Sequence, residues 1–263
     1  MKKAKKLSWK SLLTKKKPEK RLVLKLKKRA GRSRAGRITV RHRGGGAKRL
    51  YRMVDFAQGK MDMPGKVIAL EYDPYRTAFL ALVEYSDGKK SYRLAPNGVK
   101  VGEEVIVAEK GEIKVGNRLK LKNIPIGANV FNVELMPGRG GQIVRSAGTS
   151  AQVLAQDGKY THLLLPSKET RKVLSECFAT IGQVSRPGHR YERLRKAGQT
   201  RLKGKRPQVR GTVMSPRAHP HGGGEGKTPI GMPYPKTPWG KPARGVRTRK
   251  RKWTDKYIIK KRK

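Results

Sequence analysis

The residues best suited to do chemistry lie in the stretch from Arg206 to Trp239. Three consecutive glycines at its centre let the backbone approach another molecule closely, and their amide groups can face phosphate oxygens. These glycines are Gly222, Gly223 and Gly224. Positive charge surrounds them at Arg206, Arg210, Arg217 and Lys227. The combination predicts phosphate binding.

Two histidines, His219 and His221, precede the glycines and raise the question of catalysis or metal binding. Only Glu225 is close enough in sequence to add a metal ligand, which makes a poor zinc site. A general base would also need a nucleophile or an orienting acid, and none is identifiable nearby. We therefore expect the imidazoles to hydrogen-bond or stack on a binding partner, with catalysis and metal binding as the alternatives.

A nucleotide-binding P-loop is the other chemistry that this stretch suggests, because Gly226, Lys227 and Thr228 match the end of that motif. The motif requires a glycine five positions before Gly226, where this chain has His221. The surrounding prolines also exclude the strand and helix that the motif needs. We do not expect a P-loop.

Two further glycine clusters carry positive charge. The first comprises Arg41, His42, Arg43, Gly44, Gly45 and Gly46. Its flanking cations favour phosphate contacts, although an ordinary turn is the alternative. The second cluster comprises Gly138, Arg139, Gly140 and Gly141. We expect Arg139 to contact phosphate as well, although here a simple turn is a stronger alternative than in the first cluster.

The overall charge identifies the kind of partner. The chain has 263 residues with 65 Lys plus Arg against 18 Asp plus Glu, and a net charge of +47. Because such an excess repels itself across a folded surface, a polyanion must bind: DNA, RNA or an anionic membrane. The chain has no apolar stretch long enough to span a bilayer, and its lysine-rich start does not resemble a secretory signal. A mitochondrial transit peptide stays an alternative because residues 1–18 lack acids, although such peptides favour Arg and Ser over Lys. The single cysteine, Cys177, excludes an intrachain disulfide.

The acidic residues indicate where the folded part lies. All but Glu19, Glu225 and Asp255 fall between Asp55 and Glu192. We therefore expect a basic N-terminal arm over residues 1–36, with one strand or helical turn near 22–26. Residues 200–263 should form an extended arm, because their glycines and prolines prevent regular packing without an external scaffold.

Between the arms, short runs rich in Val, Leu, Tyr and Phe predict strands. Residues 37–122 should contain strands at 38–41, 50–56, 66–72, 77–85, 91–94 and 104–107, with a hairpin at Asp87–Gly88. Their spacing favours a small barrel of the oligonucleotide-binding (OB) type.

A linker at 123–127 leads to a second strand series in residues 123–199. The expected strands are 130–135, 150–156, 160–165, 171–174 and 179–184, with a hairpin at Asp157–Gly158. A short helix over 190–197 should stop at Gly198. The series predicts a second small barrel.

Aromatic residues in the C-terminal arm have no obvious core to join. They are Tyr234, Trp239, Trp253 and Tyr257. Aromatics among lysines and arginines can stack on unpaired bases, and a small local cluster is the alternative. RNA is therefore the favoured partner, and His219 and His221 would hydrogen-bond or stack on it.

Several long motifs resemble the ribosomal protein L2 family. They include GRITVRHRGGG at 36–46, LEYDP at 70–74, NIPIG at 123–127 and PGRGGQIVRSAG at 137–148. The C-terminal arm adds Arg210, Gly211 and Met214, residues 219–226, residues 237–240 and the ending at 254–257. The resemblance covers nearly everything after about residue 30 and is of the bacterial type. It implies an all-β fold in which an OB-type barrel precedes an SH3-like barrel, with both termini threading into ribosomal RNA.

The resemblance also implies a function. Family members bind large-subunit ribosomal RNA, support assembly and subunit joining, and lie near the peptidyl transferase centre. We expect other ribosomal proteins as partners, a small-subunit contact, no membrane and no homo-oligomer. No cofactor is expected, although magnesium ions bound by the RNA can lie nearby. The expected location is the cytoplasmic ribosome of a bacterium rather than an organelle.

The chain departs from the family pattern at two positions. Ser215 stands where an Asn is usual, and Ala218 where an acid usually precedes the histidines. The missing acid would have oriented His219 as a base, so we expect no catalytic residue. The rival functions are an RNA-acting hydrolase or transferase that uses His219 and His221, and a DNA-compacting protein.

Overall fold

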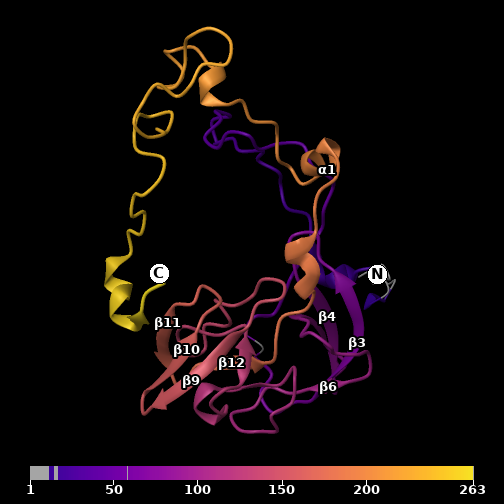
Figure 1. Cartoon of the computed structure of the whole chain (residues 1–263). Coiled ribbons are helices and arrows are strands. Elements are labelled where there is room, and N and C mark those ends of the chain that lie inside the picture. The colour runs from indigo at the N-terminus through magenta and orange to yellow at the C-terminus, as the bar shows by residue number, and fades with distance from the viewer. Residues whose placement is uncertain (1–11, 15–16, 58, 263) are drawn as a thin grey trace, which may run out of the picture. The chain divides into compact units, whose positions relative to one another are not determined.

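The computed structural model describes residues 12–14, 17–57 and 59–262 (Figure 1). Residues 1–11 and 15–16 of the predicted N-terminal arm lie outside this part. The chain divides into two units. The barrel unit comprises residues 1–27, 49–193 and 254–263, and the basic unit comprises residues 28–48 and 194–253.

The first sheet of the barrel unit corresponds to the predicted OB-type barrel. Its strands are β3 (Gly65–Tyr72), β4 (Phe79–Tyr85), β5 (Lys90–Leu94) and β6 (Glu104–Val105), in the antiparallel order β5-β4-β3-β6. Strand β4 is buried at nearly every position, which explains its continuous apolar sequence. A register shift between Val67 and Ala69 bends β3 against β4, as closing sheets require. A separate two-stranded sheet pairs β1 (Val23–Leu24) with β2 (Tyr51–Arg52). The 3-10 helix η2 (Lys20–Leu22) precedes β1.

The second sheet has seven strands in the order β13-β11-β10-β9-β8-β12-β7. They are β7 (Arg118–Lys120), β8 (Asn129–Phe131), β9 (Ala151–Asp157), β10 (Tyr160–Leu164), β11 (Thr170–Leu174), β12 (Phe178–Ile181) and β13 (Ile258–Lys260). This sheet forms the SH3-like barrel and encloses its own apolar core, which includes Leu119, Leu163 and Cys177. Both Asp-Gly hairpin predictions are confirmed, because Gly88 and Gly158 adopt positive φ at the β4–β5 and β9–β10 turns.

The strand boundaries differ from the prediction at both ends of the second barrel. Strand β7 lies within the residues assigned to the first barrel but pairs with β12. The predicted linker at 123–127 overlaps the 3-10 helix η3 (Leu121–Asn123) and contains the fully buried Ile124. The end of the predicted C-terminal arm forms β13, which pairs with β11. Three residues are too few for a periodic signal, so the sequence did not reveal β7 or β13.

Two sequence predictions near the basic unit are wrong. Residues 38–41 form no strand, because Thr39 and Val40 both donate amide bonds to the carbonyl of Gly31 in a turn. The helix expected at 190–197 is replaced by a 3-10 helix, η4 (Pro187–Tyr191), and by α1 (Ala197–Leu202). Gly198 lies inside α1, and Gly204, with φ +83°, follows its end instead.

The remaining elements of the described chain are short. They are η5 (Gly211–Val213) and η6 (Lys252–Tyr257). No helix among the described residues is long and apolar enough to cross a membrane.

A buried ion pair ties β7 and β12 of the second barrel to the segment that follows β8. The Arg118 guanidinium donates to Glu134 Oε1 at 2.8 Å and to the Asn132 carbonyl at 2.7 Å, and Glu134 accepts the Phe178 amide. Both charged side chains are at most 1% exposed. Burial lowers the pKa of Arg118, and the charge of Glu134 opposes that shift. Each of the two buried side chains therefore stabilises the charged form of the other.

Replacing Arg118 with Met should destabilise the chain by about 3–5 kcal/mol, because it leaves the Glu134 carboxylate buried without a counter-charge. Urea unfolding followed by circular dichroism measures the effect. The same substitution at the exposed Arg139 is the control, and it should change stability by less than about 0.5 kcal/mol. Equal stability of the two variants would contradict a central role for the pair. Removing both charges with Arg118→Met and Glu134→Leu should restore part of the loss.

Candidate nucleic-acid interface

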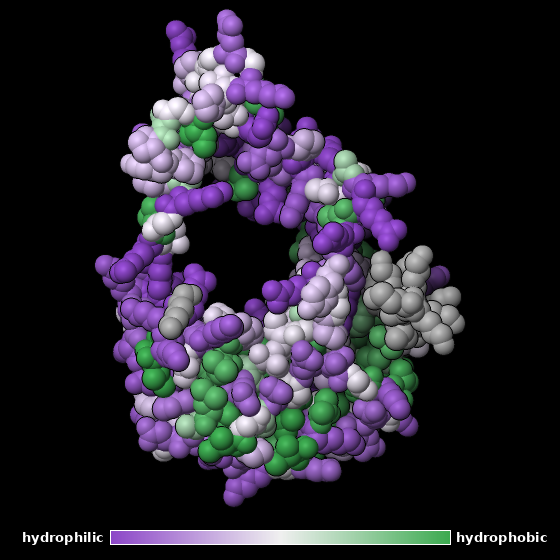
Figure 2. Space-filling model, viewed as in Figure 1, coloured by the Kyte–Doolittle hydropathy of each residue, from purple (hydrophilic) through white to green (hydrophobic). Residues whose placement is uncertain are grey.

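The basic unit concentrates positive charge and has almost no core. Residues 28–48 and 194–253 contain 25 lysines and arginines and a single acid, Glu225. All of these residues are described, and His219 is the only buried one among them. In Figure 2 hydrophilic side chains dominate the surface of residues 194–253, whereas green patches gather over the barrels. Hydrophobic burial therefore contributes little to holding this unit together.

Backbone hydrogen bonds join the first glycine cluster to the residues after α1. The Arg206 amide donates to the His42 carbonyl at 3.0 Å, and the Gly44 amide donates to the Gly204 carbonyl at 3.1 Å. Gly46 has φ +86°, and a Cβ atom there would lie 3.1 Å from the Leu202 carbonyl oxygen, so glycine best suits both the backbone conformation and the close approach of the two segments.

These backbone hydrogen bonds bring together predicted site residues that are far apart in the sequence. Arg41, His42, Arg43 and Gly44–Gly46 lie beside Arg206, and His42 Nδ1 donates to the Pro207 carbonyl at 3.0 Å. The sequence offered no signal for this pairing, because more than 150 residues separate the partners. It also missed Arg201, which α1 places against the same glycines.

A compact loop surrounds the histidines. The Gly223 amide donates to the Met214 carbonyl at 3.1 Å, and the Gly222 amide donates to the His219 carbonyl at 2.9 Å. A Cβ on Gly222 would lie 2.3 Å from the Ser215 carbonyl oxygen, and one on Gly211 would lie 2.5 Å from the His219 ring. Gly222 is therefore needed for the loop itself. This is a different reason from the close approach to phosphate that we predicted.

Hydrogen bonds within the loop also fix both imidazoles. His219 Nδ1 accepts the His221 amide at 3.0 Å, and His221 Nε2 accepts the Lys236 amide at 2.8 Å. Each neutral ring then carries its proton on the other nitrogen and has no free lone pair. Burial, together with the charges of His221 and Arg41, lowers the pKa of His219 and favours this neutral form. Neither ring is arranged as a general base.

Trp239 offers an exposed aromatic face. Its side chain is 76% exposed, and the Arg41 guanidinium lies 5.6 Å from the ring centroid. A cation on one side of an indole leaves the other side open to a base, which stacks favourably on such a ring. Tyr234 and Trp253 are also exposed.

The other predicted positions lie apart from this arrangement. Arg139 is exposed on the barrel unit, and a Cβ on Gly141 of the same cluster would overlap Asn132, so Gly141 serves the packing of the turn. Residues 220–230 form neither strand nor helix, as expected without a P-loop. The side chains of Arg210, Arg217 and Lys227 are exposed. The described residues contain no group of three or more His, Cys, Asp or Glu that could hold a metal ion.

Two small β-barrels that carry a strongly cationic, coreless unit define the class of RNA-binding β proteins. Within this class, residues 19–107 match the family Ribosomal Proteins L2, RNA binding N-terminal domain, and residues 114–240 match Ribosomal Proteins L2, C-terminal domain. The chain belongs to the ribosomal protein L2 family. It is a structural, rRNA-binding protein of the large ribosomal subunit. The gap between the two matches precedes β7, in agreement with the sheet to which β7 belongs.

The hydrogen bonds of His219 predict a specific titration. In the RNA-free chain His219 should be the Nε2–H tautomer and should titrate below 6.5, because Nδ1 accepts the His221 amide and burial disfavours the charged form. With a lowered folded pKa, the loop should be fully stable above pH 6.5 and should weaken as the pH falls through the folded pKa. Nitrogen-15 NMR of the imidazoles measures both properties. An Nδ1–H tautomer, or a pKa of His219 at or above 6.5, would contradict this description.

Proposed function

We propose that this protein supports assembly of the large ribosomal subunit, its joining to the small subunit and the architecture around the peptidyl transferase centre. Family membership supports the general role. The observation that carries the finer proposal is the basic unit, with 25 cations against one acid and a single buried side chain. Such a unit gains order and stability chiefly from phosphates around it.

The proposed mechanism is electrostatic. Lysines and arginines of the basic unit neutralise phosphates of neighbouring RNA helices and release their counterions. The RNA helices can then approach one another with less repulsion. Left-handed glycines such as Gly44, Gly45 and Gly223 let the chain turn without bulky side chains.

We propose that RNA contacts come mainly from the basic unit and from its exposed cations. The contact residues are the predicted Arg41–Gly46 cluster, Arg206, Arg210, Arg217, His221, Gly223, Gly224, Lys227 and Trp239, with Arg139 in the barrel unit. His219 contributes through the shape of the loop, since its ring is buried and hydrogen-bonded. Magnesium ions would be held by the RNA rather than by the protein.

The proposed setting is a bacterial ribosome, with ribosomal RNA and other ribosomal proteins as partners and no homo-oligomer. We further propose that the protein catalyses no reaction of its own. The absence of a free imidazole lone pair at His219 and His221 supports this, as does Ala218, which supplies no acid to orient them. A rate that survives removal of RNA and falls in His219→Ala would favour the hydrolase or transferase instead.

Replacing Gly223 with Val should impair assembly of large subunits while the barrels stay folded. Gly223 has φ +94°, and a Cβ would lie 3.0 Å from Pro216, so a β-branched side chain must distort the loop. Sucrose-gradient sedimentation of cells that carry the variant should show precursors lighter than mature large subunits. Gly188→Val is the control, because Gly188 has ordinary φ and open space around it. Mature subunits that contain Gly223→Val in normal amounts would contradict the proposal.

Replacing Trp239 with Ala should weaken binding to large-subunit ribosomal RNA by about 1–3 kcal/mol through lost stacking. The salt dependence should stay unchanged, because no charge is removed. Trp239→Phe keeps an aromatic face and should retain most of the affinity. Filter binding at several salt concentrations measures both quantities. Equal affinity of Trp239→Ala and the wild type would show that this ring does not stack on RNA.

A further inference from the structure

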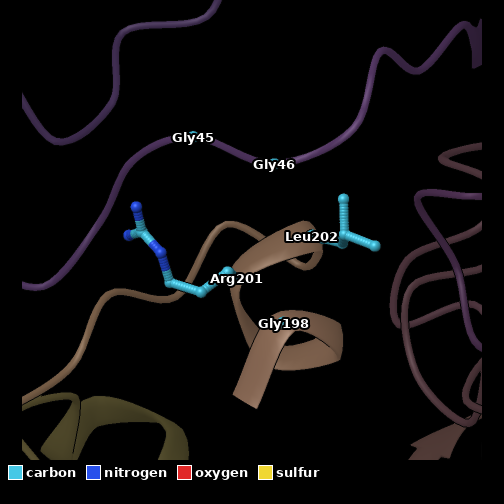
Figure 3. A pocket seen from close by; sticks show the side chains of 5 residues that line it. All are labelled: Gly45, Gly46, Gly198, Arg201 and Leu202. Carbon is cyan, nitrogen blue, oxygen red and sulfur yellow. The ribbon is translucent and has the colours of Figure 1, made fainter. Parts of the chain in front are cut away.

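An open cavity lies on the surface of the basic unit, between α1 and the first glycine cluster. Its volume is about 340 Å³, and its lining consists of Gly45, Gly46, Gly198, Arg201 and Leu202 (Figure 3). The Arg201 side chain extends from α1 toward the backbone at Gly45. Neither the sequence motifs nor the family match singles out Arg201 or this cavity.

The cavity is surrounded by unused hydrogen-bond donors. Arg201 Nη1 is buried and has no hydrogen-bond partner within the described chain. The flanking amides of Gly44 and Ala47 donate to carbonyls of Gly204 and Leu202. The two amides between them, of Gly45 and Gly46, have no backbone or side-chain acceptor among the described residues. Because a buried donor without a partner costs free energy, Arg201 Nη1 favours a ligand that supplies an acceptor, and the two glycine amides beside it can donate to the same ligand.

The backbone conformation of the glycines suits an anion. Gly45 and Gly46 have φ of +62° and +86°, a conformation that other residues rarely adopt. Successive amides in such turn conformations form concavities that bind anions. A Cβ on Gly45 would meet nothing within 4 Å, so space remains beside it.

The chemistry of the lining restricts the ligand further. A guanidinium and backbone amides only donate hydrogen bonds, and a planar guanidinium can contact two oxygens of one phosphate. Leu202, which is 61% exposed, adds an apolar wall suited to the carbon atoms of a ribose. The unit's single acid, Glu225, does not line the cavity. The ligand should therefore be a singly charged group with two free oxygens on a sugar chain.

We infer that this cavity binds one phosphodiester of the ribosomal RNA backbone, with Arg201 and the Gly45 and Gly46 amides donating to its non-bridging oxygens. The inference rests on the proposed function and assigns one phosphate to one site. Arg201 becomes a specific contact rather than one of many diffuse charges. Occupancy of the cavity also joins α1 to the glycine cluster through a shared ligand.

The test compares full-length variants in binding to large-subunit ribosomal RNA. Arg201→Gln should weaken binding about tenfold at moderate salt, because a charge-assisted contact is lost. The slope of log affinity against log salt should become shallower by about 0.7–0.9, which corresponds to one phosphate. Ethylation interference identifies the RNA phosphates whose modification weakens binding. One phosphate that interferes with binding of the wild type should no longer interfere with binding of Arg201→Gln. Arg201→Lys should keep the slope but not the full affinity, because a lysine lacks the planar pair of donors.

Arg195→Gln is the matched control, since Arg195 is exposed, precedes α1 and does not line the cavity. Ethylation of the phosphate that no longer matters for Arg201→Gln should still weaken binding of Arg195→Gln. Circular dichroism establishes that each variant keeps its barrels. If the wild type binds normally but Arg201→Gln leaves the salt slope and the interference pattern unchanged, the inference is overturned and the proposed function is not. A wild type without salt-dependent affinity for this RNA would overturn the proposed function and the inference with it.

Discussion

Repulsion between like charges in residues 28–48 and 194–253 is the constraint on which the rest of the structure depends. These residues carry 25 cations and one acid, and His219 is their only buried member. Neither a hydrophobic core nor internal ion pairs can offset that repulsion. The stabilising counter-charge must come from outside, and for a member of the ribosomal protein L2 family it is ribosomal RNA.

The barrel unit is organised in the opposite way. It contains all but one of the acids, three apolar clusters and a buried ion pair between Arg118 and Glu134. Hydrophobic burial can therefore fold this unit by itself, whereas the basic unit depends on short backbone contacts. In the basic unit, glycines allow close backbone contacts in place of a packed apolar core, because a Cβ on Gly222 would overlap the Ser215 carbonyl and one on Gly46 would crowd the Leu202 carbonyl.

The sequence predicts the features that leave periodic or compositional signals. Strands β3 and β4, both Asp-Gly hairpins and the cationic character of the arms follow from local patterns. The short strands β7 and β13 do not, because three residues carry no periodicity. The backbone pairing of Gly44 with Gly204 depends on contacts between distant segments, and so does the role of Arg201. The hydrogen bonds of His219 cannot be predicted either, since the sequence gives residue types but not which ring nitrogen accepts a hydrogen bond.

Hydrogen exchange of the full-length chain, with and without large-subunit ribosomal RNA, measures whether the basic unit depends on RNA for its stability. Amides of β4 and β10 should be protected in both states. Amides of residues 194–253 should exchange rapidly without RNA and become strongly protected in its presence. If those amides are already as protected as β4 in RNA-free buffer, the basic unit has an internal source of stability, and the account is wrong.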